Sequence, residues 1–351
     1  MNILLPSLKI TGGNIEAIKL INEISDKKLI LNNENLIYTL WHCKGGIEVF
    51  KTRVIFLSTW HAKRFLAPFQ IPYLLIKFNN LNKGVDREWI FTHYSTLPFS
   101  FFIKKNKRFF FVQDLEWKFI KNKILRFILK KFIIKTYSKG NILVANDYLE
   151  NAISKNGLDI YGNINIWADG DFLGANISEV RDIDGVMVLR KGSYKRLDLY
   201  REFISKCSLH KSITLAIITP EKVLFNEFKN SVQFCYFSPA LHDMREIYSR
   251  AKVFIHLSDH EGFGLPPLES MGAGCVPLCR DSGGVRAYME TLKEDGLMLP
   301  NSCCIDDVFE KFHALISDVK NMEMLSDKVI KVFIAGLGRD KFNFFLKKIN
   351  N

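Results

Sequence analysis

Paired cysteines are the first feature that this sequence lacks. Its 351 residues include seven cysteines, but none forms a CxxC pair or a Cys and His set with the spacing of a zinc site. An odd number of thiols in a chain of this size also gives no disulfide framework. We therefore expect reduced thiols, as in a bacterial-type cytoplasm. The cysteines stand at positions 43, 207, 235, 275, 279, 303 and 304.

A long hydrophobic run is missing as well. The most apolar long stretch, residues 65–78, contains Gln70, Lys77 and two prolines, and it is shorter than the about 20 residues that cross a bilayer. The opening MNILLPSLKITGG lacks the basic and long apolar regions of a secretory signal. We expect neither a transmembrane helix nor export. The sequence also shows no internal repeat or low-complexity tract.

Acidic residues are scarce relative to basic ones. The formal net charge is +12 at pH 7, which favours an anionic partner such as nucleic acid, acidic lipid or a phosphorylated substrate. Eleven basic residues lie between Lys104 and Lys135, where the acidic residues are Asp114 and Glu116. Charge alone does not choose among these partners.

Apolar residues, in contrast, are plentiful. The composition is 48% hydrophobic and 25% charged, as in globular proteins with a large core, and the length predicts two domains. Strand-length apolar runs alternate with helical patterns in both halves, which is typical of parallel sheets covered by helices on both faces. We predict two Rossmann-like α/β domains, residues 1–175 and 176–335, with a polar linker at 168–184 and a helical tail at 336–351. The predicted strands cover residues 2–6, 54–58, 89–93, 109–113, 141–146, 185–189, 213–219, 232–237, 252–257 and 275–279.

The most informative segment is HLSDHEGFGLPPLESMGAGCVPLCRDSGG in the second half. A strand ending at Leu257 leads into a loop that contains Gly262 and Gly264, and Pro266 and Pro267 stand where a helix can begin. Glycines let the backbone approach a ligand closely, and the N-terminal end of a helix attracts phosphate. The segment therefore predicts a phosphate-binding loop.

Two carboxylates flank this loop. We place Glu269 in the first turn of the helix, where it can accept hydrogen bonds from a ribose diol, and Glu261 at the strand end, where it can bind sugar hydroxyls. Taken singly, each is better explained without a ligand, Glu269 as a helix-terminus charge and Glu261 as a solvated loop residue.

The segment strongly resembles glycosyltransferase family 4, the retaining enzymes of the GT-B fold that carry an EGFGxPxxE-like motif. The match includes E261-GFGLPPL-E269, the small-residue helix SMGAG and D281-SGG. The resemblance implies that Glu269 binds the nucleotide ribose and Glu261 the donor sugar. It also implies that the loop and the helix start contact the sugar and phosphate, through Gly262, Phe263, Gly264 and Leu265.

The same resemblance implies an Arg and a Lys that hold the donor diphosphate. Arg190 and Lys195 stand just after the strand GVMVL, so both can project from the carboxyl edge of the sheet. Two fixed cations would neutralise the charge that develops on the leaving diphosphate. Lys191 and Arg196 compete for these roles.

Candidates in the first half are Gly12 and Gly13, His93 and Asp114. The glycine pair follows the first strand, and the family resemblance places it opposite the donor phosphate and the acceptor. His93 and Asp114 follow two predicted strands, whose carboxyl ends would line the acceptor side. His93 could bind the donor sugar or the acceptor, although a lone His is more often structural. The string FVQDLE is similar to a rhamnosyltransferase-like branch of the family.

Two DxD strings, Asp169 to Asp171 and Asp182 to Asp184, match the metal-binding signature of a different glycosyltransferase fold, GT-A. Since such strings arise easily by chance, we assign both to turns and helix caps. We predict no bound metal and no cofactor.

Residues 117–136 can form a helix with apolar positions such as Ile124 and Ile128 and basic positions such as Lys130 and Lys131. An apolar stripe of this kind most often packs on its own domain. We also hypothesise that the basic surface around it rests on anionic lipid.

The leading hypothesis is a cytoplasmic, retaining, metal-independent hexosyltransferase, peripheral on the inner face of the cell membrane. It would move a sugar from a nucleotide diphosphate sugar to a hydroxyl of a growing glycan, free or lipid-linked, in bacterial surface polysaccharide synthesis such as O-antigen. The alternatives are a GT-B-fold sugar-nucleotide epimerase or phosphorylase and a basic nucleic-acid-binding protein. The last of these does not explain Glu261 or Glu269, so we expect no nucleic-acid partner.

Overall fold

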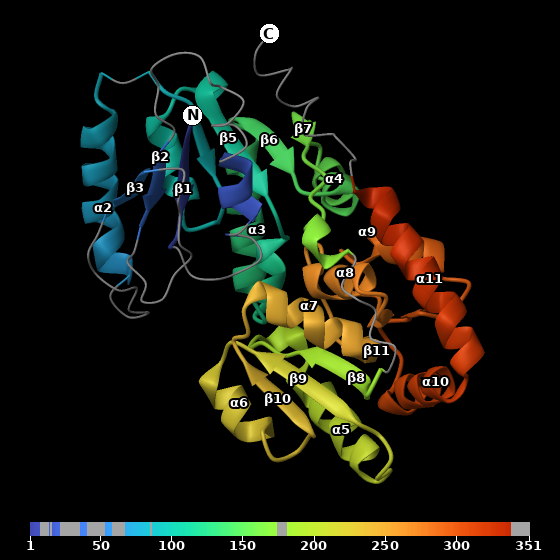
Figure 1. Ribbon diagram of the computed structural model, residues 1–351. Coiled ribbons are helices and arrows are strands. Elements are labelled where there is room, and N and C mark those ends of the chain that lie inside the picture. The colour runs from blue at the N-terminus through green and yellow to red at the C-terminus, as the bar shows by residue number, and fades with distance from the viewer. Residues whose placement is uncertain are drawn as a thin grey trace. The chain divides into compact units, whose positions relative to one another are not determined.

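The structure is a computed structural model that describes residues 1–7, 14, 16–21, 36–40, 53–57, 67–84, 86–173 and 181–337. These residues divide into two compact units, and the boundary in the sequence lies between Ile166 and Trp167. Each unit is built on one parallel sheet with its own helices (Figure 1). The prediction of two Rossmann-like α/β domains is confirmed.

The first unit has a seven-stranded parallel sheet in the order β3-β2-β1-β4-β5-β6-β7. Its core is rich in aromatic rings, since Phe78 lies against Trp89 and Phe99 with ring centroids 4.7 Å and 5.4 Å apart. The strands are β1 (Asn2–Leu5), β2 (Leu36–Thr39), β3 (Arg53–Phe56), β4 (Trp89–Phe91), β5 (Arg108–Val112), β6 (Asn141–Val144) and β7 (Gly162–Asn163). The helices are α2 (Ala67–Asn82), α3 (Lys123–Tyr137) and α4 (Asp147–Ser154).

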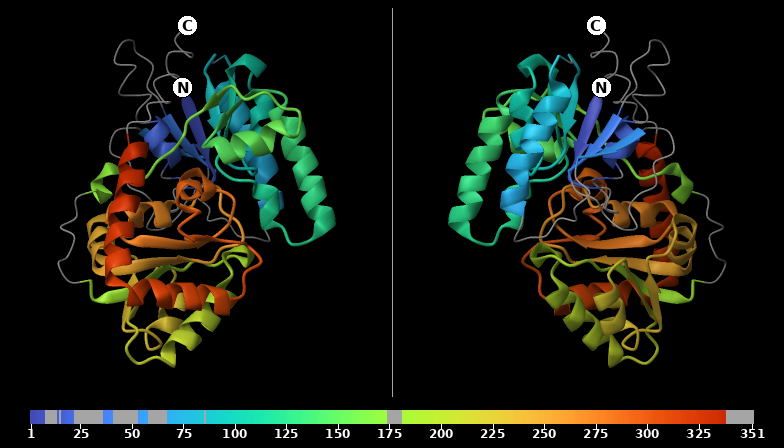
Figure 2. Two further views of the ribbon diagram at one scale, coloured as in Figure 1. Left: turned by 90° about the vertical axis from the view of Figure 1, so that its right-hand side faces the viewer. Right: turned by 90° about the vertical axis from the view of Figure 1, so that its left-hand side faces the viewer.

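The second unit has a six-stranded parallel sheet in the order β10-β9-β8-β11-β12-β13. Helices cover both faces of this sheet, with α5 and α10 on one side and α8 on the other (Figure 2). The strands are β8 (Ile183–Val188), β9 (Leu215–Thr219), β10 (Phe234–Phe237), β11 (Ala251–His256), β12 (Val276–Arg280) and β13 (Met298–Leu299). The helices are α5 (Leu197–Ser208), α6 (Lys222–Phe228), α7 (Leu241–Arg250), α8 (Leu265–Gly272), α9 (Arg286–Met289), α10 (Ile305–Ser317) and α11 (Val319–Gly336).

The start of the second unit lies earlier in the sequence than residue 176, where the sequence analysis places it. Trp167 donates a hydrogen bond from its indole N–H to the carbonyl of Phe333 at 3.1 Å, and Phe172 is buried against Tyr248. These contacts attach residues 167–173 to the second unit. The expected tail begins at the end of α11, at Gly336, and residues 338–351 lie outside the described part of the chain.

The second DxD string is not a turn, contrary to the sequence-based assignment. Asp184 lies inside strand β8, where its carboxylate accepts hydrogen bonds from the backbone N–H of Thr214 at 2.8 Å and from the Lys252 ammonium at 2.7 Å. Strand β8 begins two residues before the predicted run, so Asp184 joins the sheet. The first string behaves as expected, because Asp169 caps a short 3₁₀ turn by accepting from the N–H of Asp171.

The helix predicted over residues 117–136 is shorter than expected at its start. Helix α3 begins at Lys123, where Asn122 acts as the N-cap and accepts hydrogen bonds from the N–H groups of Ile124 and Leu125. The preceding residues, Glu116–Phe119, form a separate 3₁₀ turn. Throughout the described residues, every helix is too short or too polar to cross a bilayer.

Candidate functional site

The residues predicted to bind a donor gather at the carboxyl edge of the second sheet. Strands β8, β11 and β12 are neighbours in this sheet, and because they are parallel their carboxyl ends lie at one edge. Arg190 follows β8 by two residues, His256 ends β11, and Arg280 ends β12. The loop from Leu257 to Gly264 starts at the same edge and leads into α8.

Glycines shape this loop. Gly264 has a φ of +82° and directly precedes α8, and this left-handed conformation suits glycine. Gly284 allows a close backbone crossing, because a Cβ at this position would lie 2.5 Å from the backbone nitrogen of Phe263 and 2.6 Å from the carbonyl oxygen of Glu261. The N–H of Gly284 donates to that carbonyl at 3.1 Å. The backbone therefore holds Glu261 in a defined place.

Helix α8 begins at Leu265, so Pro266 and Pro267 are its second and third residues, as expected for a helix start. Glu269 is the fifth residue and lies in the second turn. The prediction that Glu269 falls in the first turn is therefore wrong, because the helix starts directly after Gly264. Its half-buried side chain still lies on the helix that starts at the loop.

Lys195 and Glu261 form an ion pair at this edge. The Lys195 ammonium lies 2.7 Å and 2.8 Å from the two carboxylate oxygens of Glu261, and both side chains are largely buried. Burial is the largest single influence and acts to raise the pKa of Glu261, but the charge and hydrogen bonds of Lys195, with smaller contributions from His256 and Ser258, together outweigh it, so that pKa lies below its usual range. The pair is therefore ionised at neutral pH.

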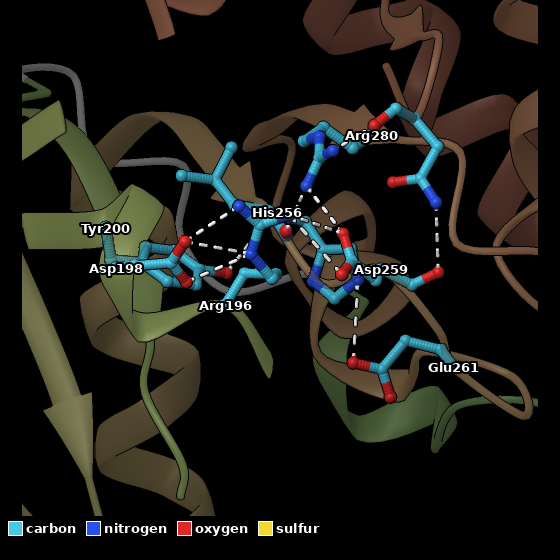
Figure 3. Close-up of polar contacts among 9 residues, drawn as sticks. Arg196, Asp198, Tyr200, His256, Asp259, Glu261 and Arg280 are labelled. Atoms are coloured by element: carbon cyan, nitrogen blue, oxygen red, sulfur yellow. Dashed lines mark hydrogen bonds and ion pairs between the residues drawn. The ribbon is translucent and has the colours of Figure 1, made fainter. Parts of the chain in front are cut away.

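His256 faces the same carboxylate (Figure 3). Its Nε2 atom lies 3.6 Å from an oxygen of Glu261; it is buried and has no hydrogen-bond partner within the described ranges. Burial lowers the pKa of His256 to about 4. A neutral imidazole thus borders the carboxylate and adds no charge to the Lys195–Glu261 pair.

A second ionic cluster holds Arg196, the residue next to Lys195, in place. Arg196 adopts a left-handed conformation, with φ and ψ both 51°, and its guanidinium binds the carboxylates of Asp198 and Asp259 at 2.7 Å and 3.0 Å (Figure 3). Arg280, almost completely buried, donates to the same oxygen of Asp259 at 3.0 Å. The cluster ties the turn that carries Lys195 to the loop after β11. Sequence reasoning identified Arg196 as a competitor of Lys195 but did not identify Asp259 or Arg280.

Lys191 and Arg196 pair with carboxylates other than Glu261. We therefore do not assign them to the donor diphosphate. The backbone N–H of Lys191 donates to Glu221 at 2.6 Å, and its exposed ammonium lies 3.8 Å from the same carboxylate. Of the three cations after Arg190, Lys195 is therefore the one that meets Glu261.

The charges of Arg190 and Glu269 both shift the pKa of Tyr248. Burial and the Glu269 charge raise the pKa of this tyrosine, whereas Arg190 acts in the opposite direction. The Tyr248 hydroxyl is buried and finds no hydrogen-bond partner among the described residues. The predicted diphosphate cation and the predicted ribose carboxylate thus lie near one common group.

The aromatic side chain of Phe263 serves packing. It is buried against Trp167 and Tyr288, with ring centroids 6.1 Å and 5.7 Å away, and the Tyr288 hydroxyl donates to the carbonyl of Gly264 at 2.6 Å. The side chain of Phe263 anchors the loop, and the backbone of this segment remains the part that we predict to face a donor. Gly262 is buried in the same loop.

In the first unit, His93 is paired with Glu116. The Nε2 atom of His93 lies 3.6 Å from an oxygen of Glu116, and the backbone N–H of Ser95 donates to Nδ1 at 3.2 Å. Since Nδ1 accepts, the neutral ring carries its proton on Nε2, toward Glu116. Burial raises the pKa of Glu116 well above its usual range and lowers that of His93 to about 4.

Asp114, the predicted carboxylate of this region, instead accepts a hydrogen bond from the N–H of the next residue, Leu115, at 2.7 Å. Glu116 is therefore the carboxylate that faces His93. The signal in the sequence was an acidic residue five positions after Phe111 in a region otherwise rich in Lys and Arg. Gly12 and Gly13 lie outside the described residues.

No metal centre is found in the parts of the chain that the structure describes, where no three His, Cys, Asp or Glu side chains are placed to hold an ion.

Residues 193–342 match the model of a family described as glycosyl transferases group 1. This match lies almost entirely within the second unit and covers less than half of the chain, so it shows what that part of the chain is similar to. The matched range includes Lys195 and the whole segment from Glu261 to Glu269, and it begins after Arg190.

Solved structures extend the likeness from the matched range to nearly the whole chain. A sucrose-phosphate synthase from Thermosynechococcus elongatus has a TM-score of 0.75 at 12% identity, and the match covers 99% of this chain and 96% of that one. WaaG, a glycosyltransferase involved in lipopolysaccharide biosynthesis, has a TM-score of 0.73 at 11% identity, with 99% and 97% covered. Anabaena Alr3699/HepE, in complex with UDP and glucose, has 0.70 at 14% identity, with 99% and 97% covered. These likenesses show the fold, which is GT-B.

A shorter match links the chain to a curated relative. A stretch of 46 residues is 48% identical to a protein of Sulfolobus islandicus filamentous virus that bears the provisional name glycosyltransferase 41. The match spans 13% of this chain and 13% of the viral protein.

Proposed function

We propose that this protein transfers a sugar from a nucleotide diphosphate sugar to a hydroxyl of a growing glycan, with retention at the anomeric carbon. The observation that carries the proposal is the Lys195–Glu261 ion pair at the carboxyl edge of the second sheet, beside the glycine-shaped loop that leads into α8. The group 1 family match over residues 193–342 supports it.

In the proposed reaction, the protein positions the substrates and stabilises the charge that develops on the leaving group. Arg190 and the Lys195 ammonium would stabilise the diphosphate as its bond to the sugar breaks. Lys195 has three N–H donors, so it can bind a phosphate oxygen and keep one bond to Glu261. Glu261 would then accept hydrogen bonds from the sugar hydroxyls, which fixes the sugar relative to its leaving group.

Glu269 would hold the nucleotide by accepting hydrogen bonds from the ribose hydroxyls. Loop residues 262–265 would contribute backbone N–H groups to the phosphates. The first unit would bind the acceptor, with His93 and Glu116 as the polar groups at the ends of β4 and β5. Gly12 and Gly13 stay candidates for the same side.

The acceptor that we propose is a glycan of a bacterial surface polysaccharide such as O-antigen, built on a lipid carrier at the inner face of the cell membrane. The likeness to WaaG, named for lipopolysaccharide biosynthesis, supports this choice. The rhamnosyltransferase-like branch stays a proposal that rests on the FVQDLE string.

Thermal-shift measurements against UDP-, GDP- and dTDP-sugars test the donor class. A ligand that binds the native state at about 100 times its Kd raises the unfolding free energy by about 2.7 kcal/mol, and the cognate donor should do so while Lys195→Met with Glu261→Gln should not respond. Transfer of labelled sugar from that donor to an added glycan then separates a transferase from an epimerase or phosphorylase. Stabilisation by random oligonucleotide, with no response to any nucleotide sugar, would contradict the proposal.

A further inference from the structure

The first two turns of α3 are exposed on all sides. From Lys123 to Ile128 every residue of this helix is exposed, and α3 lies at the outer margin of the first unit (Figure 2). Leu129 is partly buried against the core of the unit, and full burial begins at Ile133. The sequence-based view that this stripe packs on its own domain holds only from Leu129 onward.

The exposed turns carry large apolar side chains. The exposed fractions are 72% for Ile124, 56% for Leu125, 56% for Phe127 and 57% for Ile128. Single exposed apolar residues are common on soluble proteins, but four within five positions form a patch that marks an interaction surface. The Asn122 cap holds the helix in place at this end.

The charge around the patch has one sign. Residues 117–140 contain eight Lys or Arg and no Asp or Glu. The Lys131 ammonium lies 4.6 Å from the ring centroid of Phe127, so charge and apolar surface are in direct contact. A helix with exposed apolar residues and only basic charged residues fits the boundary between anionic headgroups and acyl chains.

We propose that the N-terminal half of α3 is a docking surface for anionic lipid, with Ile124, Leu125, Phe127 and Ile128 inserted among the acyl chains. The lysines and Arg126 lie at the level of the phosphate headgroups. A second copy of the chain is a poorer occupant, because each of the two facing segments would bring eight basic residues and like charges across an interface repel. The inference goes beyond the proposed transfer and does not depend on it, since lipid binding is measured without donor or acceptor.

Co-sedimentation of the full chain with vesicles tests this surface. We expect binding to phosphatidylcholine vesicles that contain phosphatidylglycerol and no binding to phosphatidylcholine alone, with partial weakening by salt. Phe127→Glu combined with Ile128→Glu should lower the partition coefficient by roughly tenfold or more. Val223→Glu is the matched control, because Val223 is an apolar residue of the second unit with 61% of its surface exposed, and it should bind as the wild type does.

Fluorescence of an Ile124→Trp variant gives an independent reading. Its emission should shift to shorter wavelength with the anionic vesicles, relative to the wild type with the same vesicles. Equal binding to both vesicle types, equal binding of the α3 double variant, or an unshifted Ile124→Trp spectrum would overturn the proposal. So would a wild-type chain that dimerises through these residues or binds random oligonucleotide while ignoring vesicles.

Discussion

Lys195 shows how one residue can prepare a site for an anion. Its ammonium is largely buried with Glu261, and the pKa of that carboxyl is held below its usual range. A carboxyl with a lowered folded-state pKa contributes stability above its ordinary pKa and loses it as the pH falls through the lowered value. The pair is therefore intact across neutral and mildly acidic pH, and a cation is in place before any diphosphate arrives.

Glu269 provides the test of ribose binding. Because a buried diol would lose a charged acceptor, Glu269→Ala should weaken nucleotide-sugar binding by about 1 to 3 kcal/mol. Isothermal calorimetry measures this difference, and Glu310→Ala, an exposed change on α10, serves as the control. Unchanged donor affinity in Glu269→Ala would remove this residue from the proposed site.

Arg190 and Lys191 are adjacent in sequence but have different surroundings. Arg190→Ala should lower turnover by roughly 10²-fold or more, the scale expected when one preorganised charge-stabilising donor is lost. Lys191→Ala should stay within about twofold of the wild type, because the ammonium of Lys191 is exposed beside Glu221. Steady-state kinetics with saturating donor distinguish the two, and equal losses would reassign the phosphate ligand.

His256 gives the second unit a defined response to acid. Its pKa is lowered by burial from 6.5 to about 4, so its contribution to stability is fully present above pH 6.5 and is lost as the pH falls toward 4. Between about pH 7 and about pH 5, the wild type should lose about 2 kcal/mol more unfolding free energy than His256→Leu. Urea unfolding at both pH values measures the difference, and parallel losses would show that the ring titrates normally.

At the scale of elements, the backbone at Gly284 crosses the backbone of residues 261–263 and holds the loop before α8 in position. An added methyl group at Gly284 would meet backbone atoms of Gly262, Phe263 and Glu261 at 2.5 to 2.6 Å, and backbone cannot move aside as a flexible side chain can. Gly284→Ala should therefore displace the loop and reduce donor affinity by about tenfold or more.

The matched control is Gly170→Ala, because a Cβ there would have its nearest neighbour 3.9 Å away. Donor titration of both variants, with circular dichroism to check folding, completes the comparison. A Gly284→Ala protein that binds donor normally would show that the crossing is not needed.

The ten predicted strands are all present, because each has an apolar run long enough to read from the sequence. Three strands were not predicted. Strands β7 and β13 have two residues each, which is too short for any periodicity. Strand β2 has four residues, LIYT, and its apolar character was not distinguished from the polar residues around it.

Site residues were predictable where they share one segment, as Glu261 and Glu269 do. Contacts between distant segments were not. Lys195 and Glu261 are separated by 66 positions, and their pairing depends on the conformation of the turn at Arg196 and its contact with Asp259. In the same way Glu116, rather than Asp114, faces His93 because a 3₁₀ turn follows β5.

At the scale of the whole molecule, fixed cations can replace a metal ion. Arg190, Lys195 and the backbone N–H groups of the loop can neutralise the leaving diphosphate, so we expect transfer to continue in excess EDTA. Asn at both Asp169 and Asp171 should have little effect, because Asp169 caps a turn. Loss of activity in EDTA that Mn²⁺ restores, together with an essential aspartate pair, would contradict this expectation.

The bond between Trp167 and Phe333 has a consequence for the order of synthesis. The two residues are 166 positions apart, and at about 5 to 20 residues per second a ribosome needs roughly 10 to 30 seconds to make the intervening chain. Gly272, at the end of α8, packs against both Phe172 and Phe333 in the finished protein, so until α11 emerges it is covered from the Phe172 side alone. Gly272 and Phe333 are 61 positions apart, so for roughly 3 to 12 seconds of that time the nascent second unit exposes the part of this small-residue apolar face that Phe333 later covers.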